Sequence, residues 1–280
     1  MRSVIIAAII CSMLTPVLAA AQQKDEEIEI RNLNLHVSAD MFSAVTTMEI
    51  EFYNPNAKVL DGSFQFSLLA HQVVTGFSLD INGLMRQGVI TTKQNGRIAY
   101  ENTIRRRIDP GLLEMTGNNN YRVRIYPMPA NGTRKITITI SEQLQIKQNA
   151  LVYQFPMDIS YAIKSYRWKV DASSAFRPEF GNGEQGENVF QNSGENKYSL
   201  QGGKKNIRLK NTLSFSIPIP EKKMVISSYV TGDSVSRFAL HVKPMLGNYP
   251  VPNFKSIVVF WDVSSSAAKR QNSYGKFFPN

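Results

Sequence analysis

The 280-residue sequence predicts a mainly β fold made of more than one domain. Apolar and polar residues alternate along one segment after another, which is the period of a strand with one buried and one wet face. Asn-Gly turn dipeptides recur, and 17 Gly and 13 Pro are spread along the chain, as expected for many strands joined by turns. A hydrophobic fraction of 42% with 19% charged residues describes a globular chain rather than a disordered one.

The first 21 residues predict a signal peptide. Arg2 is followed by an apolar stretch over residues 4–14, and small residues at 19–21 suit cleavage before Gln22 or Ala20. That stretch is shorter than the roughly 20 residues needed to cross a bilayer. We therefore expect an exported protein that is periplasmic, on the cell surface or secreted.

The position of the only cysteine limits which chemistry the mature chain can carry out and indicates the kind of organism it comes from. Cys11 is the only cysteine and would leave with the signal peptide. The mature chain would then lack disulfides, a thiol nucleophile and thiolate metal ligands. An exported protein of this size without disulfides suggests a bacterium. No later segment has the roughly 18 consecutive apolar residues of a membrane anchor.

Residues 22–150 show the alternation most clearly, which favours antiparallel sheets. Strands are expected around Leu33–Val37, Met48–Phe52, Phe64–Leu68, Phe77–Ile81, Val123–Ile125 and Ile136–Ile140. Asn and Gly tolerate positive φ, so the pairs at 82–83, 95–96 and 131–132 are predicted turns.

One segment departs from the strand period. Tyr100, Ile104 and Ile108 are four residues apart, which predicts a short helix that ends at Asp109-Pro110-Gly111. Arg105, Arg106 and Arg107 on this helix are a candidate polyanion-binding cluster. The alternative is a solvated face, because three consecutive helical residues fan around the axis.

Residues 151–253 predict an accessory β region beside the first one. Alternation continues less regularly, and Pro218 should end a strand. The stretch from Phe180 to Asn206 is rich in Gly, Asn, Gln and Glu, so we expect long polar loops around short strands there.

The first region resembles the VIT domain, the vault-protein and inter-α-trypsin module. The resemblance rests on pieces in a fixed order: Val74–Leu79 with Asn82-Gly83, Ala99-Tyr100-Glu101, Asp109–Glu114, Asn120–Pro129, and Lys135–Ile138 with Leu144. Leu68-Leu69-Ala70 departs from the proline-containing stretch usual in the family. The resemblance implies an antiparallel β-sandwich over residues 22–150.

VIT domains are commonly followed by a von Willebrand factor A domain, and residues 254–280 resemble the start of one. The apolar run Ile257–Phe260 predicts a strand buried on both faces, and Asp262-Val263-Ser264-Ser265-Ser266 follows it. In the family this motif belongs to a metal-ion-dependent adhesion site: Asp262 would act through water, and Ser264 and Ser266 would bind Mg²⁺. The missing Thr and second Asp come from later loops, so we expect an incomplete α/β domain and no bound metal in this chain.

The function expected from the resemblance is a non-enzymatic scaffold of the adhesion type. It would bind a protein, matrix or envelope ligand, with metal dependence only if the A domain is complete. No nucleic acid partner, cofactor or membrane-spanning anchor is expected.

Two alternatives stay open. The formal charge of +10 is dispersed over clusters such as Lys204-Lys205 with Arg208 and Lys210. A basic β surface of this kind would bind anionic glycans or envelope polymers, unless it is only a solvated surface. An enzyme would need scattered residues such as His36, His71, His241, Asp158 or Asp171 to converge, since no hydrolase or phosphate-binding motif is present.

Overall fold

The computed structural model describes residues 26–40, 42–81, 83–89, 93–105, 111–181, 189–219, 224–230 and 236–242. The predicted signal peptide, Arg106, Arg107 and the A-type start with Asp262, Ser264 and Ser266 lie outside these residues. Their roles remain predictions.

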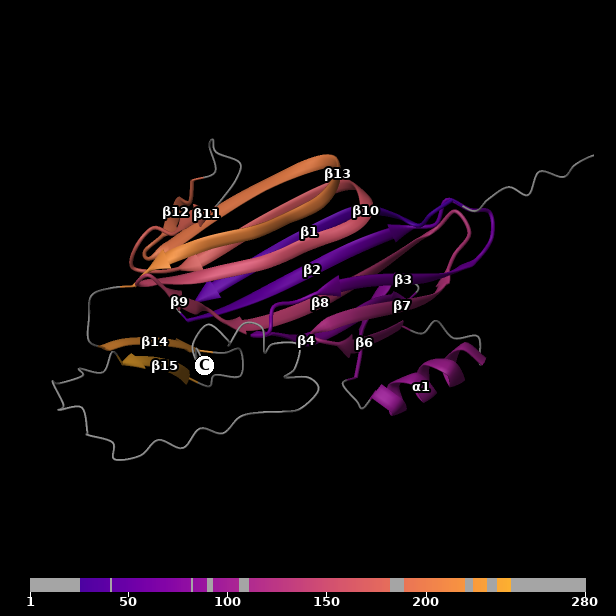
Figure 1. Cartoon of the computed structure of the whole chain (residues 1–280), viewed down its shortest axis with the longest axis horizontal. Helices are drawn as coiled ribbons and strands as arrows, with labels where there is room; N and C mark the ends of the chain where they lie inside the picture. Colours follow the sequence, from indigo (N-terminus) through magenta and orange to yellow (C-terminus); the bar gives the residue numbers. More distant parts are fainter. Residues whose placement is uncertain are drawn as a thin grey trace, which may run out of the picture. The chain divides into compact units, whose positions relative to one another are not determined.

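The described chain is dominated by strands, which confirms the mainly β prediction (Figure 1). The elements are β1 (Glu29–Asp40), β2 (Ser43–Tyr53), β3 (Leu60–Ser67), β4 (Gln72–Ile81), β5 (Leu84–Gln87), α1 (Lys93–Arg105), β6 (Gly111–Gly117), β7 (Asn120–Met128), β8 (Thr133–Gln143), β9 (Gln145–Lys147), β10 (Ala150–Ser173), β11 (Glu179–Gly181), β12 (Gln191–Gly194), β13 (Lys197–Pro218), β14 (Met224–Val230) and β15 (Ser236–Val242).

Ten strands form one large sheet with the order β11-β13-β10-β1-β2-β8-β4-β5, with β12 added at β13 and β9 at β10. Most neighbours are antiparallel, as the alternation predicts. The exception is β1, which pairs with β10 in parallel from Ile30 opposite Ile163 to Asp40 opposite Ser173. That parallel partner lies beyond residues 22–150, and the strand pairs within residues 22–150 are antiparallel as predicted. The strand beginning at Ala150 continues the same sheet.

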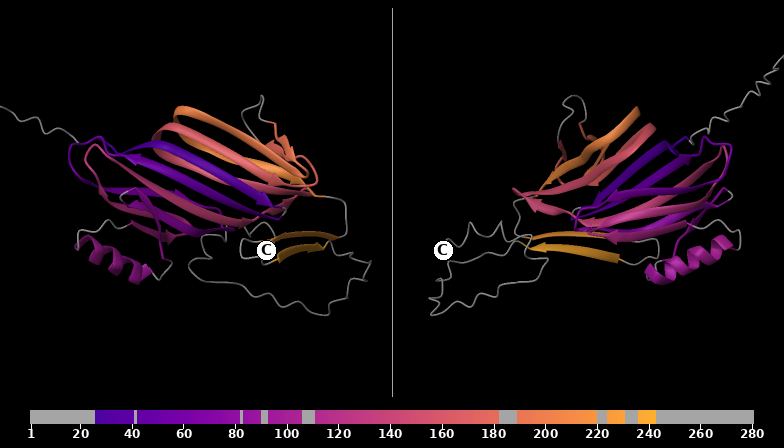
Figure 2. Two further views of the ribbon diagram at one scale, coloured as in Figure 1. Left: turned by 180° about the vertical axis from the view of Figure 1, so that it is seen from behind. Right: turned by 45° about the vertical axis from the view of Figure 1, so that its right-hand side comes forward.

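The long strands β10 and β13 each bend back over the sheet they belong to (Figures 1 and 2). The β10–β13 register shifts between Ile159 and Ile163, and Asn206, next to Ile207 opposite Ile163, has a φ of 54°. Bulges of this kind bend a strand and re-aim its side chains. As a result the Tyr166 hydroxyl donates to the Met157 sulfur at 3.3 Å, although both belong to β10. The first half of β10 thus faces the second half across the core.

A three-stranded sheet, β3-β7-β6, extends the second layer. Phe64 of β3 contacts Phe52 of the large sheet at 5.6 Å between ring centroids, and it contacts Tyr161 in the bend of β10 at 6.0 Å. The Tyr161 hydroxyl also donates to the Ser63 carbonyl at 2.8 Å. Two layers packed face to face make this a β-sandwich.

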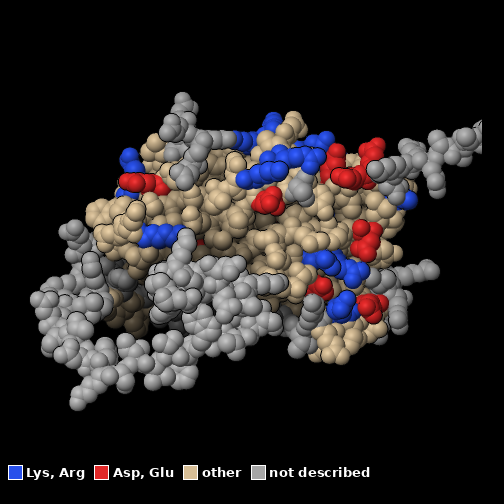
Figure 3. All heavy atoms as spheres, viewed as in Figure 1, with Lys and Arg blue, Asp and Glu red and all other residues tan. Residues whose placement is uncertain are grey.

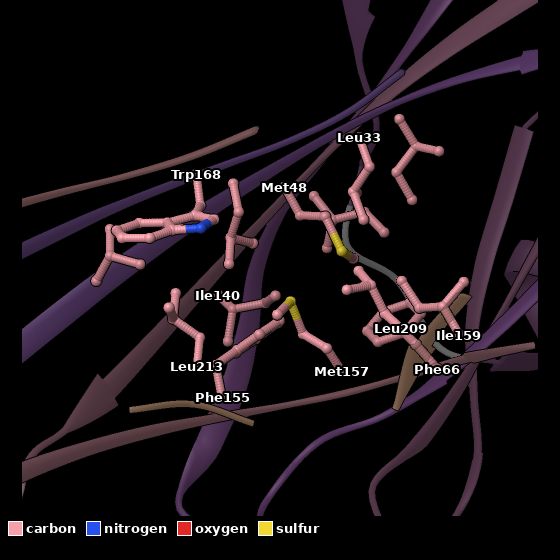
Figure 4. Close-up of a cluster of buried hydrophobic side chains, with 14 of the residues drawn as sticks. Leu33, Met48, Phe66, Ile140, Phe155, Met157, Ile159, Trp168, Leu209 and Leu213 are labelled. Atoms are coloured by element: carbon pink, nitrogen blue, oxygen red, sulfur yellow. The ribbon is translucent and has the colours of Figure 1, made fainter. Parts of the chain in front are cut away.

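The core lies between the layers and holds one continuous cluster of apolar side chains. Figure 4 shows Ile140 beside Phe155 and Leu213 of the folded-back segments, with Trp168 above them. All four are at least 90% buried. Burial of this kind contributes about 1.5–3 kcal/mol for each large side chain, so both layers are needed for stability.

Two of the predicted turns occur and one does not. Asn131 has a φ of 48° between β7 and β8, and Gly83 has a φ of 81° between β4 and β5. Asn95-Gly96 instead lies in the first turn of α1. A helix occurs where it was predicted, with Tyr100 buried and the Arg124 guanidinium 4.9 Å from its ring centre. Its predicted end falls at residues 106–110, outside the described residues. Contact with the sheet outweighs the turn preference of the dipeptide.

The polar stretch 180–206 was predicted as loops, and this is wrong at its end. Residues 197–206 belong to β13, where they pair with β10 as far as Lys205 opposite Ser165. The partner strand supplies the hydrogen bonds that composition alone does not suggest. Pro218 ends β13, as predicted. The pair β14–β15 forms a separate two-stranded sheet.

The chain divides into two units, residues 1–221 with 226–239, and residues 222–225 with 240–280. The β-sandwich belongs to the first unit.

Candidate functional site

The outer face of the large sheet carries the polar side chains that alternate with the core residues. Across neighbouring strands these side chains form transverse rows, since paired residues point to the same face. One row contains Gln201, Lys169, His36, Thr47 and Thr139. The next contains Gly203, Arg167, Asn34, Glu49 and Thr137.

An open hollow of about 710 Å³ lies on these rows. It is lined mainly by residues of β1, β2, β10 and β13, namely Asn34, His36, Thr47, Glu49, Arg167, Lys169 and Gln201 together with Gly202 and Gly203. The two glycines leave the β13 side of the hollow without side chains. The lining therefore offers amides, a hydroxyl and charges of both signs at one surface.

Two side chains that line this hollow, His36 and Lys169, both contact Asp171. Asp171 Oδ2 lies 2.8 Å from His36 Nε2 and 2.8 Å from Lys169 Nζ. Burial alone would raise the pKa of Asp171, but hydrogen bonds from Lys169, His36 and Ser199 outweigh it and lower that pKa. The carboxylate thus stays ionised and fixes the positions of the Lys169 and His36 side chains rather than acting as a base near neutral pH.

A second hollow of about 290 Å³ adjoins the first through Asn34, Glu49 and Arg167. It is lined by Glu51 of β2, by Lys135 and Thr137 of β8, and by the half-exposed Met85 of β5. Arg167 Nε donates to Asn34 Oδ1 at 3.3 Å, and Asn32 donates to Glu51. We call the two hollows together the polar groove.

The side chains that line the polar groove are suited to hydrogen bonding and to ion pairing with a ligand. Its hydrogen-bonding groups are spread along the surface, and its lining contains no cysteine or serine nucleophile beside a base. Within the part of the chain that the structure describes, no cluster of three or more His, Cys, Asp or Glu could hold a metal ion.

A separate polar cluster lies inside the sandwich. Glu142 of β8 is buried, and its Oε1 accepts a 2.8 Å hydrogen bond from Gln72 Nε2. His71 Nε2 lies 3.2 Å from Glu142 Oε2. Burial raises the pKa of Glu142 to about 7 despite the Gln72 hydrogen bond. Burial lowers the pKa of His71, and nearby Lys147 lowers it further.

Gln72 and Asn119 hold the segment Leu68–His71, where the sequence departs from the usual VIT pattern. Gln72 Oε1 accepts from the Leu69 amide at 2.9 Å, and Asn119 Nδ2 donates to the Leu69 carbonyl at 2.6 Å. The hydrogen bonds of the Glu142 cluster therefore hold the connection between β3 and β4. The raised pKa of Glu142 comes from its burial in this structural cluster and does not by itself indicate a catalytic role.

The residues singled out from the sequence are mostly not brought together. Arg105 is the last residue of α1, and its two basic neighbours lie outside the described residues. Asp158 is exposed on the folded-back half of β10, whereas Asp171 lies on the outer face of the other half. His36 and His71 belong to different sites, one on the outer face and one in the interior cluster.

Sequence reasoning missed the polar groove. Its residues occupy the outward-facing positions of ordinary alternating strands. They become neighbours because β1 pairs with β10 in parallel, and nothing in the sequence of either strand indicates that pairing. The one available clue was the basic run at Lys204-Lys205 with Arg208 and Lys210, which adjoins the groove on β13.

Comparison with known proteins supports the family assignment of the first region. Residues 30–140 match the vault protein inter-alpha-trypsin (VIT) domain. The matched residues include most of β1 to β8, so the groove residues on β1, β2 and β8 lie inside the VIT match. The β10 and β13 walls lie outside the matched residues.

Solved structures with a similar course of the chain are only distantly related. One is a putative nutrient binding protein from Legionella pneumophila, with 12% identity, a TM-score of 0.43 and 68% of this chain and 67% of that chain covered. Another is a putative protease from Parabacteroides distasonis, with 9% identity, a TM-score of 0.40 and 69% and 41% covered. An M1 zinc metallopeptidase from Deinococcus radiodurans has 8% identity, a TM-score of 0.40 and 81% and 50% covered.

This chain thus spans about half or less of the length of the last two proteins. No curated protein matches it in sequence. Among the described residues, no helix is both long and apolar enough to cross a membrane.

Proposed function

We propose that this chain is an exported, non-enzymatic β scaffold that binds a protein ligand through the polar groove. The observation that carries the proposal is the continuity of the groove over strands inside and outside the VIT match, through the shared residues Asn34, Glu49 and Arg167. The groove is built both by strands within the VIT match and by β10 and β13, which follow it. These two strands would therefore contribute to ligand binding as well as to the core.

The lining favours a protein over a uniformly charged polymer. Arg167 and Lys169 lie beside Glu49 and Glu51, and the half-exposed Met85 lies at one end. Charges of both signs with an apolar contact suit the mixed surface of a protein, and they give specificity more than raw affinity. An anionic polymer would be repelled by the two glutamates.

The experiment is site-directed photo-crosslinking in the envelope or extracellular fraction of cells that express the chain. A photoreactive residue at Thr47 or Thr137 should capture a defined protein, and the same residue at exposed Met115 of β6 serves as the control. Glu49→Lys and Arg167→Glu should each reduce capture at least ten-fold. Equal capture from Met115, or capture unaffected by both variants, would overturn the proposal.

Three further measurements separate the alternatives. We expect EDTA to leave capture unchanged, because Mg²⁺ would matter only in a form of the chain with a complete A-type domain. Turnover of a captured ligand, lost in His71→Ala or Asp158→Ala, would identify an enzyme instead. Competition by dextran sulfate at low salt, without capture of any protein, would indicate the polyanion-binding alternative.

A further inference from the structure

The polar groove has a basic side and an acidic side. The basic side is formed by Arg167 and Lys169 of β10. The acidic side is formed by Glu49 and Glu51 of β2. Both strands pair with β1, which lies between them. Neighbouring strands lie about 4.8 Å apart, so the two sides are about 10 Å apart, a width that accommodates one extended chain with side chains directed to both sides.

The charges of Arg167 and Glu49 are both available to a ligand. The two residues lie on either side of Asn34 in one transverse row. Both are exposed, and neither forms an ion pair with a residue that the structure describes. Arg167 Nε donates to Asn34 Oδ1 at 3.3 Å, which restricts the position of the guanidinium. Its terminal nitrogens have the geometry that binds a carboxylate in a bidentate manner.

The second charge on each side is shared with a neighbouring side chain. Lys169 Nζ lies 2.8 Å from Asp171 Oδ2, and Lys135 Nζ lies 3.9 Å from Glu51 Oε1. Contacts between partly exposed charges are weak, so Lys169 and Glu51 remain able to interact with a ligand. Figure 3 shows acidic side chains beside basic ones in several places on one face of the molecule. The surface is therefore mixed in charge, and the order of the charges in the groove matters more than their sum.

The floor of the groove between its two sides is formed by β1. Asn32 and Asn34 line the second hollow, and His36 lines the first. An asparagine side chain carries both a hydrogen-bond donor and an acceptor, as a peptide group does. A chain that lies along β1 can therefore form hydrogen bonds between its backbone and this floor.

The spacing of charges along the groove matches that of an extended chain. Residues two apart in a strand lie about 6.6–6.8 Å apart and point to the same face, in this sheet and in a bound extended segment alike. Alternate side chains of such a segment would face Arg167 and Lys169, and the others would face Glu49 and Glu51. Complementary charge then requires acidic residues in the first set and basic residues in the second.

We propose that the polar groove binds an extended segment of a partner protein in which acidic and basic residues alternate. The acidic side chains would face Arg167 and Lys169, and the basic ones would face Glu49 and Glu51. This inference rests on the proposed function and names the class of ligand for the same groove. A segment whose charges are grouped by sign would place some of its side chains against like charges, which selects against it.

The test compares two blocked and fluorescently labelled peptides of the same composition, (Glu-Lys)4 and (Glu-Glu-Lys-Lys)2, with the chain at low salt. Both peptides have zero net charge, and both are too short to form a stable helix alone. We expect fluorescence anisotropy to show at least five-fold tighter binding of the alternating peptide, and this binding should weaken as salt increases. Equal affinity of the two peptides, or no binding of the alternating one, would overturn the proposal.

A variant of one groove residue should change which peptide is preferred. Arg167→Glu gives its transverse row two carboxylates, so it should weaken the alternating peptide at least five-fold and bind octalysine more tightly than the parent does. Arg177→Glu makes the same change in net charge at an exposed position between β10 and β11, and it should leave both affinities within two-fold. Equal effects of the two variants would show that only net charge is recognised, which contradicts the proposal. Thermal unfolding verifies that both variants fold.

The result can be separated from that of the crosslinking experiment. A protein captured at Thr47 and lost in Glu49→Lys, together with equal binding of the two peptides, would support the proposed function and overturn the alternating segment. Such a result would show that the groove contacts a folded surface. Absence of a captured protein would overturn the proposed function itself, and this inference with it.

Discussion

The hydroxyl groups of Thr46 and Tyr153 lie 2.7 Å apart in the core, although 107 residues separate them. Thr46 belongs to β2 within the VIT match, and Tyr153 belongs to the folded-back half of β10 beyond it. Both are fully buried. The hydrogen bond therefore joins the two parts of the chain at the centre of the sandwich.

A double-mutant cycle at this pair should show strong coupling. Thr46→Val or Tyr153→Phe alone leaves one buried hydroxyl without its partner, at a cost of about 1–3 kcal/mol in the free energy of unfolding. The double variant should cost less than the sum of the two single variants, because both polar groups are then gone. Urea denaturation measures all four proteins, and additive losses would contradict the expected coupling.

The same contact predicts that the VIT region does not fold alone. A chain of residues 22–148 lacks β10 and β13, which leaves the β1 edge unpaired and removes Tyr153, Phe155, Leu213 and Phe215 from the core. It should show no cooperative unfolding transition, whereas a chain of residues 22–221 should unfold cooperatively. Circular dichroism during heating distinguishes the two. A sharp transition in the shorter chain would establish an independent domain ending near residue 150.

The sequence foretells the strands better than their partners, and the reason is physical. Alternation at Leu33–Val37 and Ile136–Ile140 records which side chains face the core, so both strands were placed correctly. It carries no information on which strand lies alongside. The parallel pair of β1 with β10 and the fold-back at Ile159–Ile163 therefore could not be predicted.

The polar groove could not be predicted from the sequence for the same reason. Asn34 and Arg167 become neighbours only through the parallel register, and each is an unremarkable outward residue within its own strand. Asn95-Gly96 illustrates the converse limit: a strong local turn signal was overridden because α1 packs Tyr100 into the protein.

Gly202 should tolerate no side chain. A Cβ built there would lie 2.6 Å from Trp168 Cζ2, which is closer than van der Waals contact allows. Gly202→Ala should lower the free energy of unfolding by about 1–3 kcal/mol and alter Trp168 fluorescence. Trp168→Phe in the same chain supplies space, so the double variant should lose less than the two single variants combined. An unchanged denaturation midpoint for Gly202→Ala would contradict the close packing.

Stability should depend on pH through Glu142. Its pKa is raised to about 7 in the folded protein from 4.5, so between these values the folded state binds more protons than the unfolded state. The stability contributed by the protonated carboxyl is present below about pH 4.5 and is lost as the pH rises to about 7. The titratable neighbours of Glu142 are His71 and Tyr153. The lowered pKa of His71 acts in the opposite sense, with stability lost as the pH falls below 6.5.

The measurement is therefore made in a His71→Gln background. Replacement of Glu142 by Gln should raise the free energy of unfolding relative to the parent by an amount that grows between pH 4.5 and 7, to the order of 2 kcal/mol, and then stays constant. Glu179→Gln, at an exposed position on β11, serves as the matched control for loss of a carboxylate. Parallel curves for Glu142→Gln and its parent would show that this carboxyl ionises as freely in the folded chain as in the unfolded one, which its burial between Gln72 and His71 opposes.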